Sequence, residues 1–169
     1  DVVWFATSNG ISRLEIDFDK WTSYREPDLP STNVIWAMVM SEYVWFVTDK
    51  GLARYDKLLR SWKTYDLSDG IISYSVNNVV LAGNSIWLAT NDGVSSYDPV
   101  SDSWTPGVAY HTMLPSKNVM DLALDADIIW FCTDRGVSTY DRKTGSWRHY
   151  KTSDGLLDES CQAIAISDQ

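Results

Sequence analysis

One short segment occurs four times in this chain, and this repetition constrains the fold more than any other feature of the sequence. The copies read VWFATSNGISRLEIDFDKWTSY, VWFVTDKGLARYDKLLRSWKTY, IWLATNDGVSSYDPVSDSWTPG and IWFCTDRGVSTYDRKTGSWRHY. Each has a Gly six residues after its first Trp and a second Trp eleven residues after that Gly. The first Trp residues, separated by 41, 42 and 43 positions, are Trp4, Trp45, Trp87 and Trp130. We therefore expect four copies of one structural unit.

Each copy, together with the apolar run before it, is typical of four short antiparallel strands. In the second copy we expect strands over 34–39, 43–48, 52–56 and 61–65, because β-branched and aromatic residues suit a pleated, half-buried surface. Gly51 and its counterparts supply the positive φ that a tight hairpin requires. Four such strands in 41–43 residues describe a blade of an all-β protein, a β-propeller of four-stranded antiparallel blades.

The repeat cores, at 3–24, 34–65, 76–106 and 119–150, indicate a single β-propeller domain or propeller segment over residues 1–169. The chain opens on a second strand and closes on a first strand at 161–166, so we expect one blade to be split between the two termini. Pairing these strands would remove two exposed edges. A closed four-bladed ring, two chains in an eight-bladed ring and a piece of a longer propeller all satisfy this pairing.

The composition argues against several classes of binding partner. The net charge of −9 argues against nucleic acid and anionic lipid, and no apolar run approaches the ~20 residues that span a bilayer. Cys132 and Cys161 have no CxxC or His-rich companion, so we expect no metal or other cofactor. Their strand-like surroundings favour buried free thiols, whereas a disulfide would require the two Cβ atoms to face each other.

The motif W-[FL]-x-T-x-x-G-[ILV]-x-x-[LY]-[DE], followed by x-x-W-x-x-Y, resembles the two-component regulator propeller repeat. All four copies match it, and residues 139–157, TYDRKTGSWRHYKTSDGLL, are particularly similar. The resemblance implies a sensor propeller outside the cytoplasmic membrane, periplasmic or extracellular, of the kind that bacterial hybrid histidine kinases use to respond to carbohydrates. Family propellers usually have more blades and precede a membrane helix and a kinase, so the sensor role is implied for a parent protein.

Positions that are uniform across the copies are expected to be structural. The eight repeat Trp residues suit a core between blades, the recurring Thr (such as Thr48) suits a hydrogen bond to the turn, and the recurring acid (such as Asp56) suits a hairpin cap. The third place of each first strand instead varies, as Trp36, Asn78, Asp121 and Ala163. Because first strands line the channel of a propeller, this place predicts ligand-binding residues, with a water-filled axis as the alternative.

The turns and the loops between blades are expected on the same face as the starts of the first strands. Its candidate ligand-binding residues are Lys50, Arg135, Tyr74, Tyr110 and His111. Aromatic rings beside polar groups suit a sugar, whose C–H faces stack and whose hydroxyls need partners. These residues predict a non-catalytic sensor propeller for an oligosaccharide or another small extracytoplasmic ligand.

Catalysis and protein–protein interaction are the two alternatives to ligand binding. A glycosidase could pair Asp121 with Asp154, and a lyase could use His111 as a base, but His111 and His149 occupy inequivalent places and acidic pairs are common in an acidic chain. We therefore predict that the chain is not an enzyme. The main alternative is a protein–protein interaction scaffold, by self-association or against neighbouring blades, which a broad exposed apolar patch would favour.

Overall fold

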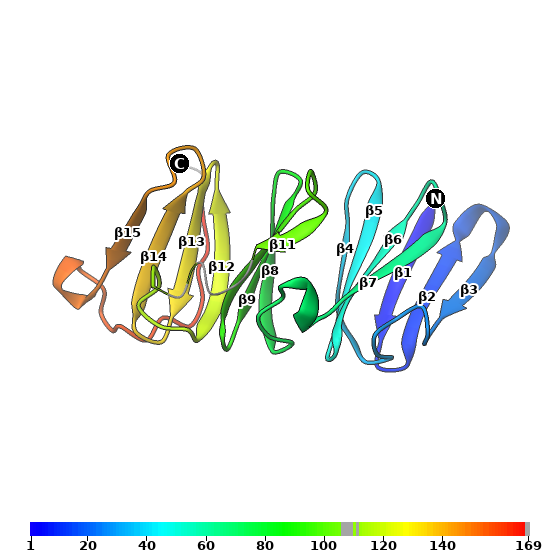
Figure 1. The fold of residues 1–169 in the computed structure, drawn as a ribbon, viewed down its shortest axis with the longest axis horizontal. Coiled ribbons are helices and arrows are strands. Elements are labelled where there is room, and N and C mark those ends of the chain that lie inside the picture. The colour runs from blue at the N-terminus through cyan, green and yellow to red at the C-terminus, as the bar shows by residue number, and fades with distance from the viewer. Residues whose placement is uncertain (106–109, 111, 168–169) are drawn as a thin grey trace. The chain divides into compact units, whose positions relative to one another are not determined.

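The computed structural model describes residues 1–105, 110 and 112–167, and the chain divides into two compact units, Asp1–Asp69 and Gly70–Gln169. Each unit contains two antiparallel sheets whose strands follow chain order (Figure 1). The first unit holds β1 (Val2–Thr7), β2 (Gly10–Glu15), β3 (Lys20–Tyr24), β4 (Val34–Val39), β5 (Tyr43–Thr48), β6 (Gly51–Asp56) and β7 (Ser61–Tyr65). The second holds β8 (Val76–Ala82), β9 (Ser85–Thr90), β10 (Gly93–Asp98), β11 (Ser103–Thr105), β12 (Val119–Asp125), β13 (Ile128–Thr133), β14 (Gly136–Asp141) and β15 (Trp147–Tyr150).

The predicted all-β architecture is confirmed. In the second copy the four strands begin and end where the sequence places them, except that β6 starts one residue earlier, at Gly51. The first sheet has three strands, in the order β1-β2-β3, because the first copy has no first strand before it. Short 3-10 turns, η1 (Ile16–Phe18), η2 (Leu67–Asp69) and η4 (Thr152–Asp154), lie between strands. In the part of the chain that the structure describes, no helix is long and apolar enough to cross a membrane.

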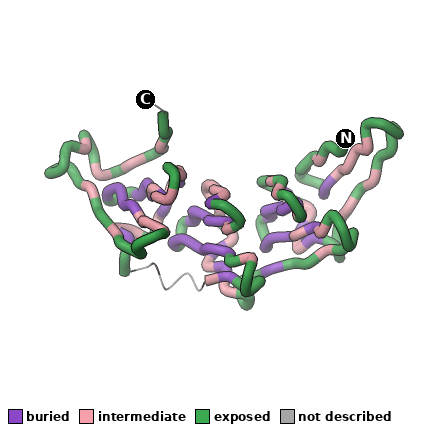
Figure 2. The backbone as a smooth tube through the Cα atoms, turned by 90° about the horizontal axis from the view of Figure 1, so that it is seen from above, coloured by how far each residue is buried: buried purple, intermediate pink, exposed green. Residues whose placement is uncertain are grey.

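Repeat aromatics form the core of each unit, as the sequence predicts, except that the repeat residue Trp21 is 56% exposed. In the first unit the ring of Phe46, fully buried, lies 5.4 Å from that of Trp4 and 5.7 Å from that of Trp62. In the second unit Phe131, also fully buried, lies 6.0 Å from Trp87 and 5.2 Å from Trp147. The buried residues are concentrated in the second and third strands of the three complete blades (Figure 2). Burial of these large rings is the main stabilising term of each sheet pair.

Backbone conformation and lack of space both require Gly at the fixed hairpin position. Gly136 has φ +123, a conformation that L-residues rarely adopt, and a Cβ there would lie 2.9 Å from the backbone oxygen of Tyr150. Gly51 meets the same obstacle in the carbonyl of Tyr65. At Gly51 and Gly136 the end of the outer strand therefore passes directly over the hairpin, and only Gly leaves room for it.

Replacing Gly136 with Ala is expected to lower the free energy of unfolding by more than the same change at Gly155. Both residues have similar positive φ, +123 and +115, so both variants bear left-handed strain of about 1–3 kcal/mol. Only at Gly136 does the new Cβ meet a backbone carbonyl, since no atom lies within 4 Å of a Cβ at Gly155. Urea denaturation of the two variants measures the difference, and equal losses would contradict the steric explanation.

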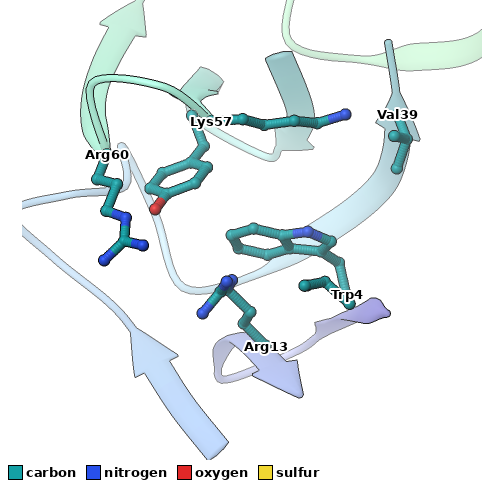
Figure 3. Close-up of a pocket in the computed structure, with 7 residues that line it drawn as sticks. Trp4, Arg13, Val39, Lys57 and Arg60 are labelled. Atoms are coloured by element: carbon teal, nitrogen blue, oxygen red, sulfur yellow. The ribbon is translucent and has the colours of Figure 1, made fainter. Parts of the chain in front are cut away.

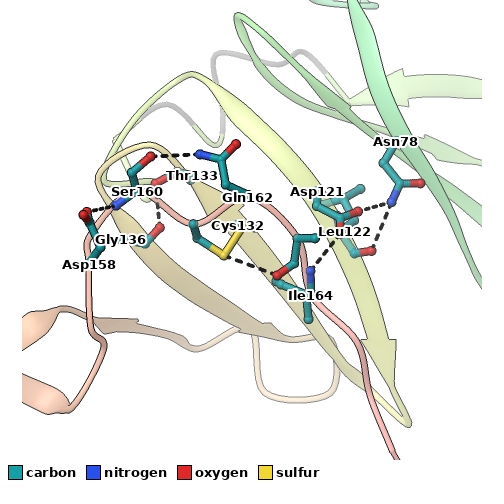
Figure 4. The surroundings of a disulfide bond; sticks show 12 residues. Asn78, Asp121, Leu122, Cys132, Thr133, Gly136, Asp158, Ser160, Gln162 and Ile164 are labelled. Atoms are coloured by element: carbon teal, nitrogen blue, oxygen red, sulfur yellow. Dashed lines mark hydrogen bonds between the residues drawn. A yellow bond between two sulfur atoms is a disulfide. The ribbon is translucent and has the colours of Figure 1, made fainter.

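The predicted closing strand at 161–166 is not a regular strand within the described residues 156–167. A strand is stabilised by a continuous ladder of backbone hydrogen bonds. This segment is instead held at separate points in the second unit, where Cys161 N donates to Thr133 O at 3.0 Å and Ile164 N donates to an Asp121 carboxylate oxygen at 2.8 Å. The segment thus lies beside strands of the last blade (Figure 4), and its pairing with a strand of another blade stays a prediction.

Candidate functional site

The variable third place of the first strands coincides with a shared irregularity. In β4, β8 and β12 the pairing with the next strand shifts register immediately before Trp36, Asn78 and Asp121. A β-bulge of this kind re-aims the following side chain and is common beside functional sites. The three complete blades thus present the predicted residues from the same distorted point of the strand.

In the second unit this point is a hydrogen-bonded network. Asn78 donates its side-chain N–H to the Asp121 carboxylate, which also accepts from the backbone N–H groups of Leu122 at 2.9 Å and Ile164 at 2.8 Å (Figure 4). The structure therefore brings Asn78 and Asp121 together. Their polar groups are largely committed to joining neighbouring first strands and the C-terminal segment.

Trp36 differs from Asn78 and Asp121, which are half-buried, because it remains open to solvent. Its side chain is 39% exposed in the first unit. The neighbouring Ile35, at 46%, is also exposed on β4. A partly exposed indole provides a flat apolar surface for a ligand ring.

The starts of the first strands and the turns between the second and third strands lie at one end of each blade, as predicted. We call this the loop end. Asp49 N donates to Asn33 O at 3.3 Å, and the Asn33 amide donates to the Asp49 carboxylate at 3.1 Å. The last blade repeats the arrangement, with the Asn118 amide donating to Asp134 at 3.3 Å. These contacts attach each inter-blade loop to a turn of the following hairpin.

The uniform Thr and acidic positions are structural, as expected. The Thr48 hydroxyl donates to Gly51 O at 2.8 Å and accepts from the backbone N–H of Lys50 at 3.2 Å. Asp56 caps the next hairpin by accepting from the N–H groups of Leu58 at 2.8 Å and Leu59 at 2.7 Å. Side chains with such backbone roles are not available for ligand chemistry.

The remaining predicted ligand-binding residues occupy different environments. Lys50 is exposed at a turn of the first unit and Arg135 at the equivalent turn of the second. Tyr74 is half-buried in the loop before β8. Lys50 and Arg135 are thus accessible at the loop ends of their own units, and Tyr74 is partly accessible.

Tyr110 belongs to the core rather than to a ligand platform. Its ring lies 5.3 Å from Trp87 and 6.1 Å from Trp147, and its hydroxyl is 2.9 Å from that of Ser96. The prediction of an open aromatic face at Tyr110 is therefore not supported, because burial against the repeat Trp residues is more favourable for a large ring than exposure. His111 lies outside the described residues.

The hydrogen bonds to the Asp134 carboxyl are expected to make the stability of the second unit sensitive to acid. The hydroxyl of Ser116 and the amide of Asn118 hold the pKa of Asp134 below its ordinary value. A carboxyl with a lowered pKa in the folded state stabilises at pH values above its unfolded pKa, about 3.9, and this contribution is lost as pH falls through the folded pKa. Unfolding in urea at pH 5 and pH 3 should therefore show a slightly smaller loss of stability for Asp134→Asn than for the wild type.

The third blade provides a natural version of that variant. There the Asn77 amide donates to Asn91, the counterpart of Asp134, at 2.8 Å. An amide oxygen therefore accepts the same kind of bond without titrating. Equal acid sensitivity in the wild type and the variant would show that the hydrogen bonds to Asp134 do not contribute to stability, as is common at exposed positions.

Cys132 and Cys161 form a disulfide, with Cα atoms 5.2 Å apart (Figure 4). The expectation of two free thiols was wrong, because their strand-like surroundings say nothing of which strands are neighbours. Cys161 occupies the place that Val119 has in the previous blade, and Cys132 the place of Ala89. Val119 and Ala89 pack in one buried cluster. The disulfide therefore replaces an apolar contact of the kind that joins successive blades.

The sequence did not predict a pocket that the structure shows in the first unit. A cavity of about 320 Å³ lies among Trp4, Arg13, Tyr55, Lys57 and Arg60 (Figure 3). The valines Val2 and Val39 complete its lining. It lies beside the turn between β6 and β7, at the opposite end of the blade from the loop end. Within the described residues, no group of three or more His, Cys, Asp and Glu side chains could hold a metal ion.

Comparison with known proteins shows the fold. No protein-family model and no curated protein sequence matches the chain. Among solved structures, the extracellular domain of a protein classified as a hybrid two-component system of B. thetaiotaomicron matches 88% of the chain at 18% identity with a TM-score of 0.66. The extracellular domain of a protein classified as a one-component system of the same organism matches 100% at 21% identity with a TM-score of 0.70. PorZ, a surface component of the type-IX secretion system of Porphyromonas gingivalis, matches 97% at 12% identity with a TM-score of 0.61.

The chain spans only about a quarter of each of these structures, namely 23%, 24% and 28% of their lengths. The match is to the extracellular domains of the regulatory proteins, which is the kind of protein that the repeat motif resembles. The chain therefore has the β-propeller fold, in common with extracellular domains of two-component systems.

Proposed function

We propose that this chain is a non-catalytic, ligand-binding part of an extracytoplasmic sensor propeller. The observation that carries the proposal is the match of 88% or more of the chain to extracellular domains of proteins classified as two-component or one-component systems. The Cys132–Cys161 disulfide supports the location, since disulfides persist in oxidising compartments. The signal would be passed on by parts of a longer protein.

The proposed ligand is a carbohydrate bound at the loop end. Trp36, 39% exposed, offers an apolar face for stacking, and the exposed Lys50 offers hydrogen-bond donors at the same end of its own unit. Arg135 is an exposed donor at the loop end of the second unit. Sugar recognition combines such a flat ring with charged or polar partners for hydroxyl groups.

A non-catalytic role fits the state of the acidic residues. Asp121, the most promising general acid or base of the predicted set, accepts hydrogen bonds from Asn78, Leu122 and Ile164. A carboxylate whose oxygens already accept from three donors has little room to contact a substrate proton. We expect no hydrolysis of the oligosaccharides that bind.

Titration with a panel of oligosaccharides, followed by intrinsic Trp fluorescence, tests this function. We expect a saturable change in the wild type and none in Trp36→Phe, which keeps an aromatic ring but removes the indole that reports. Trp21→Phe is the matched control, because Trp21 is an exposed Trp of the same unit, at 56%, in an outer strand. A change that survives in Trp36→Phe, or none with any sugar in a folded protein, would contradict a glycan site at Trp36.

A second candidate is a protein–protein scaffold. Exposed aromatic side chains occur in the first sheet, where Phe5, 40% exposed, stacks with Trp21 at 5.5 Å, and in the turn η1, where Phe18 is 77% exposed. Exposed apolar groups of this kind favour association with another protein surface. Concentration-dependent sedimentation, together with failure of every sugar to bind, would favour this function over the first.

A further inference from the structure

We propose that the pocket of the first unit, defined by Trp4, Arg13, Tyr55 and Arg60, binds a small aromatic carboxylate. The site is separate from the proposed carbohydrate site, because it lies at the β6–β7 turn rather than at the loop end. Its volume, about 320 Å³, is at the lower end of the range of small-molecule sites. The inference goes beyond the proposed function and rests on different residues.

Arg60 is the residue that first singles out the pocket. It lies nine residues after the hairpin Gly, at a turn position that takes a left-handed conformation in all four copies. Asp19, Asp102 and Gly145 occupy this position elsewhere, with φ of 45°, 50° and 72°, and Arg60 has φ 54°. Gly and Asp tolerate such a conformation, whereas a long side chain has no local reason to be there. Its presence in one copy points to a role for the guanidinium.

Arg13 provides the second cation. It lies on β2, and its guanidinium carbon is 5.6 Å from the centre of the Trp4 ring. One guanidinium nitrogen donates to Glu15 at 2.5 Å, while among the described residues the buried Nε has no partner. In the second unit the position of Arg13 is occupied by Ser96 and Thr139, and that of Arg60 by Asp102 and Gly145. The pair Arg13 and Arg60 is therefore specific to the first unit.

The charge around the pocket favours an anion. An adjoining cavity of about 220 Å³ shares Arg13, Tyr55 and Arg60 and adds Lys20 and Glu15. The two cavities together therefore present the cations Arg13, Lys20, Lys57 and Arg60 against the single carboxylate Glu15. In a chain of net charge −9 this is a local reversal of sign. Such a concave basic patch attracts anions by its field.

Lys57 has a structural duty, which leaves the Arg pair to bind the ligand. Its ammonium donates to the backbone oxygens of Met40 at 2.5 Å and Ser41 at 3.2 Å. Arg142, its counterpart in the last blade, likewise donates to the carbonyls of Ala82 and Ala126, at 3.0 and 3.2 Å. Figure 3 shows Lys57 extending toward the side of Val39, while the guanidinium groups of Arg13 and Arg60 lie on the other side of the Trp4 ring.

The rest of the lining selects the body of the ligand. Val2 and Val39 offer no hydrogen-bond partners, so the hydroxyls of a sugar would be left unpaired against them. A planar aromatic body would instead gain from the apolar walls and from Trp4 and Tyr55. A carboxylate matches the fork of donors on a guanidinium, and pairing with Arg is stronger than with a neutral group.

The test is a titration of the full 169-residue chain with phenylacetate, followed by the side-chain N–H signal of Trp4 in two-dimensional NMR. Trp4→Phe assigns the signal. We expect a saturable shift with phenylacetate and at least tenfold weaker binding of phenylacetamide, which has the same shape but no charge. Arg60→Gly, which copies the residue of the last blade, should weaken phenylacetate at least tenfold and keep the fold.

Lys117→Ala is the matched control, because it removes one exposed positive charge from the second unit and should leave the affinity unchanged. Equal binding of the acid and the amide would overturn the anion site. Unchanged affinity in Arg60→Gly would overturn the role of Arg60. Tighter binding of glucuronate than of phenylacetate at the Trp4 signal would overturn the aromatic body and assign the pocket to an acidic sugar.

Discussion

Phe46→Ala is expected to lower the free energy of unfolding of the first unit by about 3–5 kcal/mol. The ring is fully buried on β5 and packs against Trp4 and Trp62, which come from different sheets of that unit. Its removal leaves a cavity between rigid aromatic neighbours that cannot close around it. Urea denaturation followed by near-UV circular dichroism measures the loss.

Phe18→Ala is the control for this prediction. It makes the same chemical change at a ring that is 77% exposed in the turn η1, so we expect a change within about 0.5 kcal/mol. If the two variants lost the same stability, the repeat aromatics would not be the core that holds the two sheets together.

Cys161→Ala is expected to cost about 3–4 kcal/mol of stability in the second unit. The disulfide closes a loop with a sequence separation of 29 residues, and loss of such a crosslink frees a comparable amount of chain entropy in the unfolded state. The segment after residue 156 should then exchange its amide hydrogens faster, because it is otherwise held by a few separate hydrogen bonds.

The chain offers its own control for the disulfide. The double variant Cys132→Ala and Cys161→Val reproduces the Ala89 and Val119 pair of the preceding blade. It restores an apolar contact without a crosslink, so its stability should lie between those of the wild type and of Cys161→Ala. Two reactive thiols in the unreduced wild type would contradict the disulfide itself.

Much of the fold was predictable because one pattern recurs with fixed spacing. The bounds of β5 follow from its apolar run, and the hairpin before β6 follows from Gly51, whose place is the same in every copy. The segment 161–166 has the composition of a strand but lacks a continuous ladder, and composition alone does not supply one. Strand pairing is a property of neighbours, so local sequence could not decide it.

The candidate sites were less predictable, since they depend on contacts between blades. Variation between the copies identified Asn78 and Asp121 as candidate site residues. It did not predict the hydrogen bond between them. Tyr110 is a residue type that often stacks on ligands, but its position in the fold packs it against the core. Neither the pairing of the two cysteines nor the packing of Tyr110 can be seen along a single strand.

The pocket at Trp4 was missed although a signal for it exists in the sequence. Arg60 stands where the other copies have Asp or Gly, and comparison of copies at turn positions would have found it. In the first strands variation between copies predicts channel residues, whereas the signal at Arg60 lies in a turn. Without the structure, a variable turn residue is not distinguishable from ordinary surface variation.

The disulfide also decides how this part of the protein would carry mechanical load. A pull on the chain beyond residue 161 would be delivered through Cys161 to Cys132, in the fully buried middle of the last blade. Residues 156–160 would then bear little of that tension, because the covalent bond bypasses them. Peeling the segment away would require rupture of a sulfur–sulfur bond or distortion of β13, and the last blade is thereby suited to transmit force without unravelling.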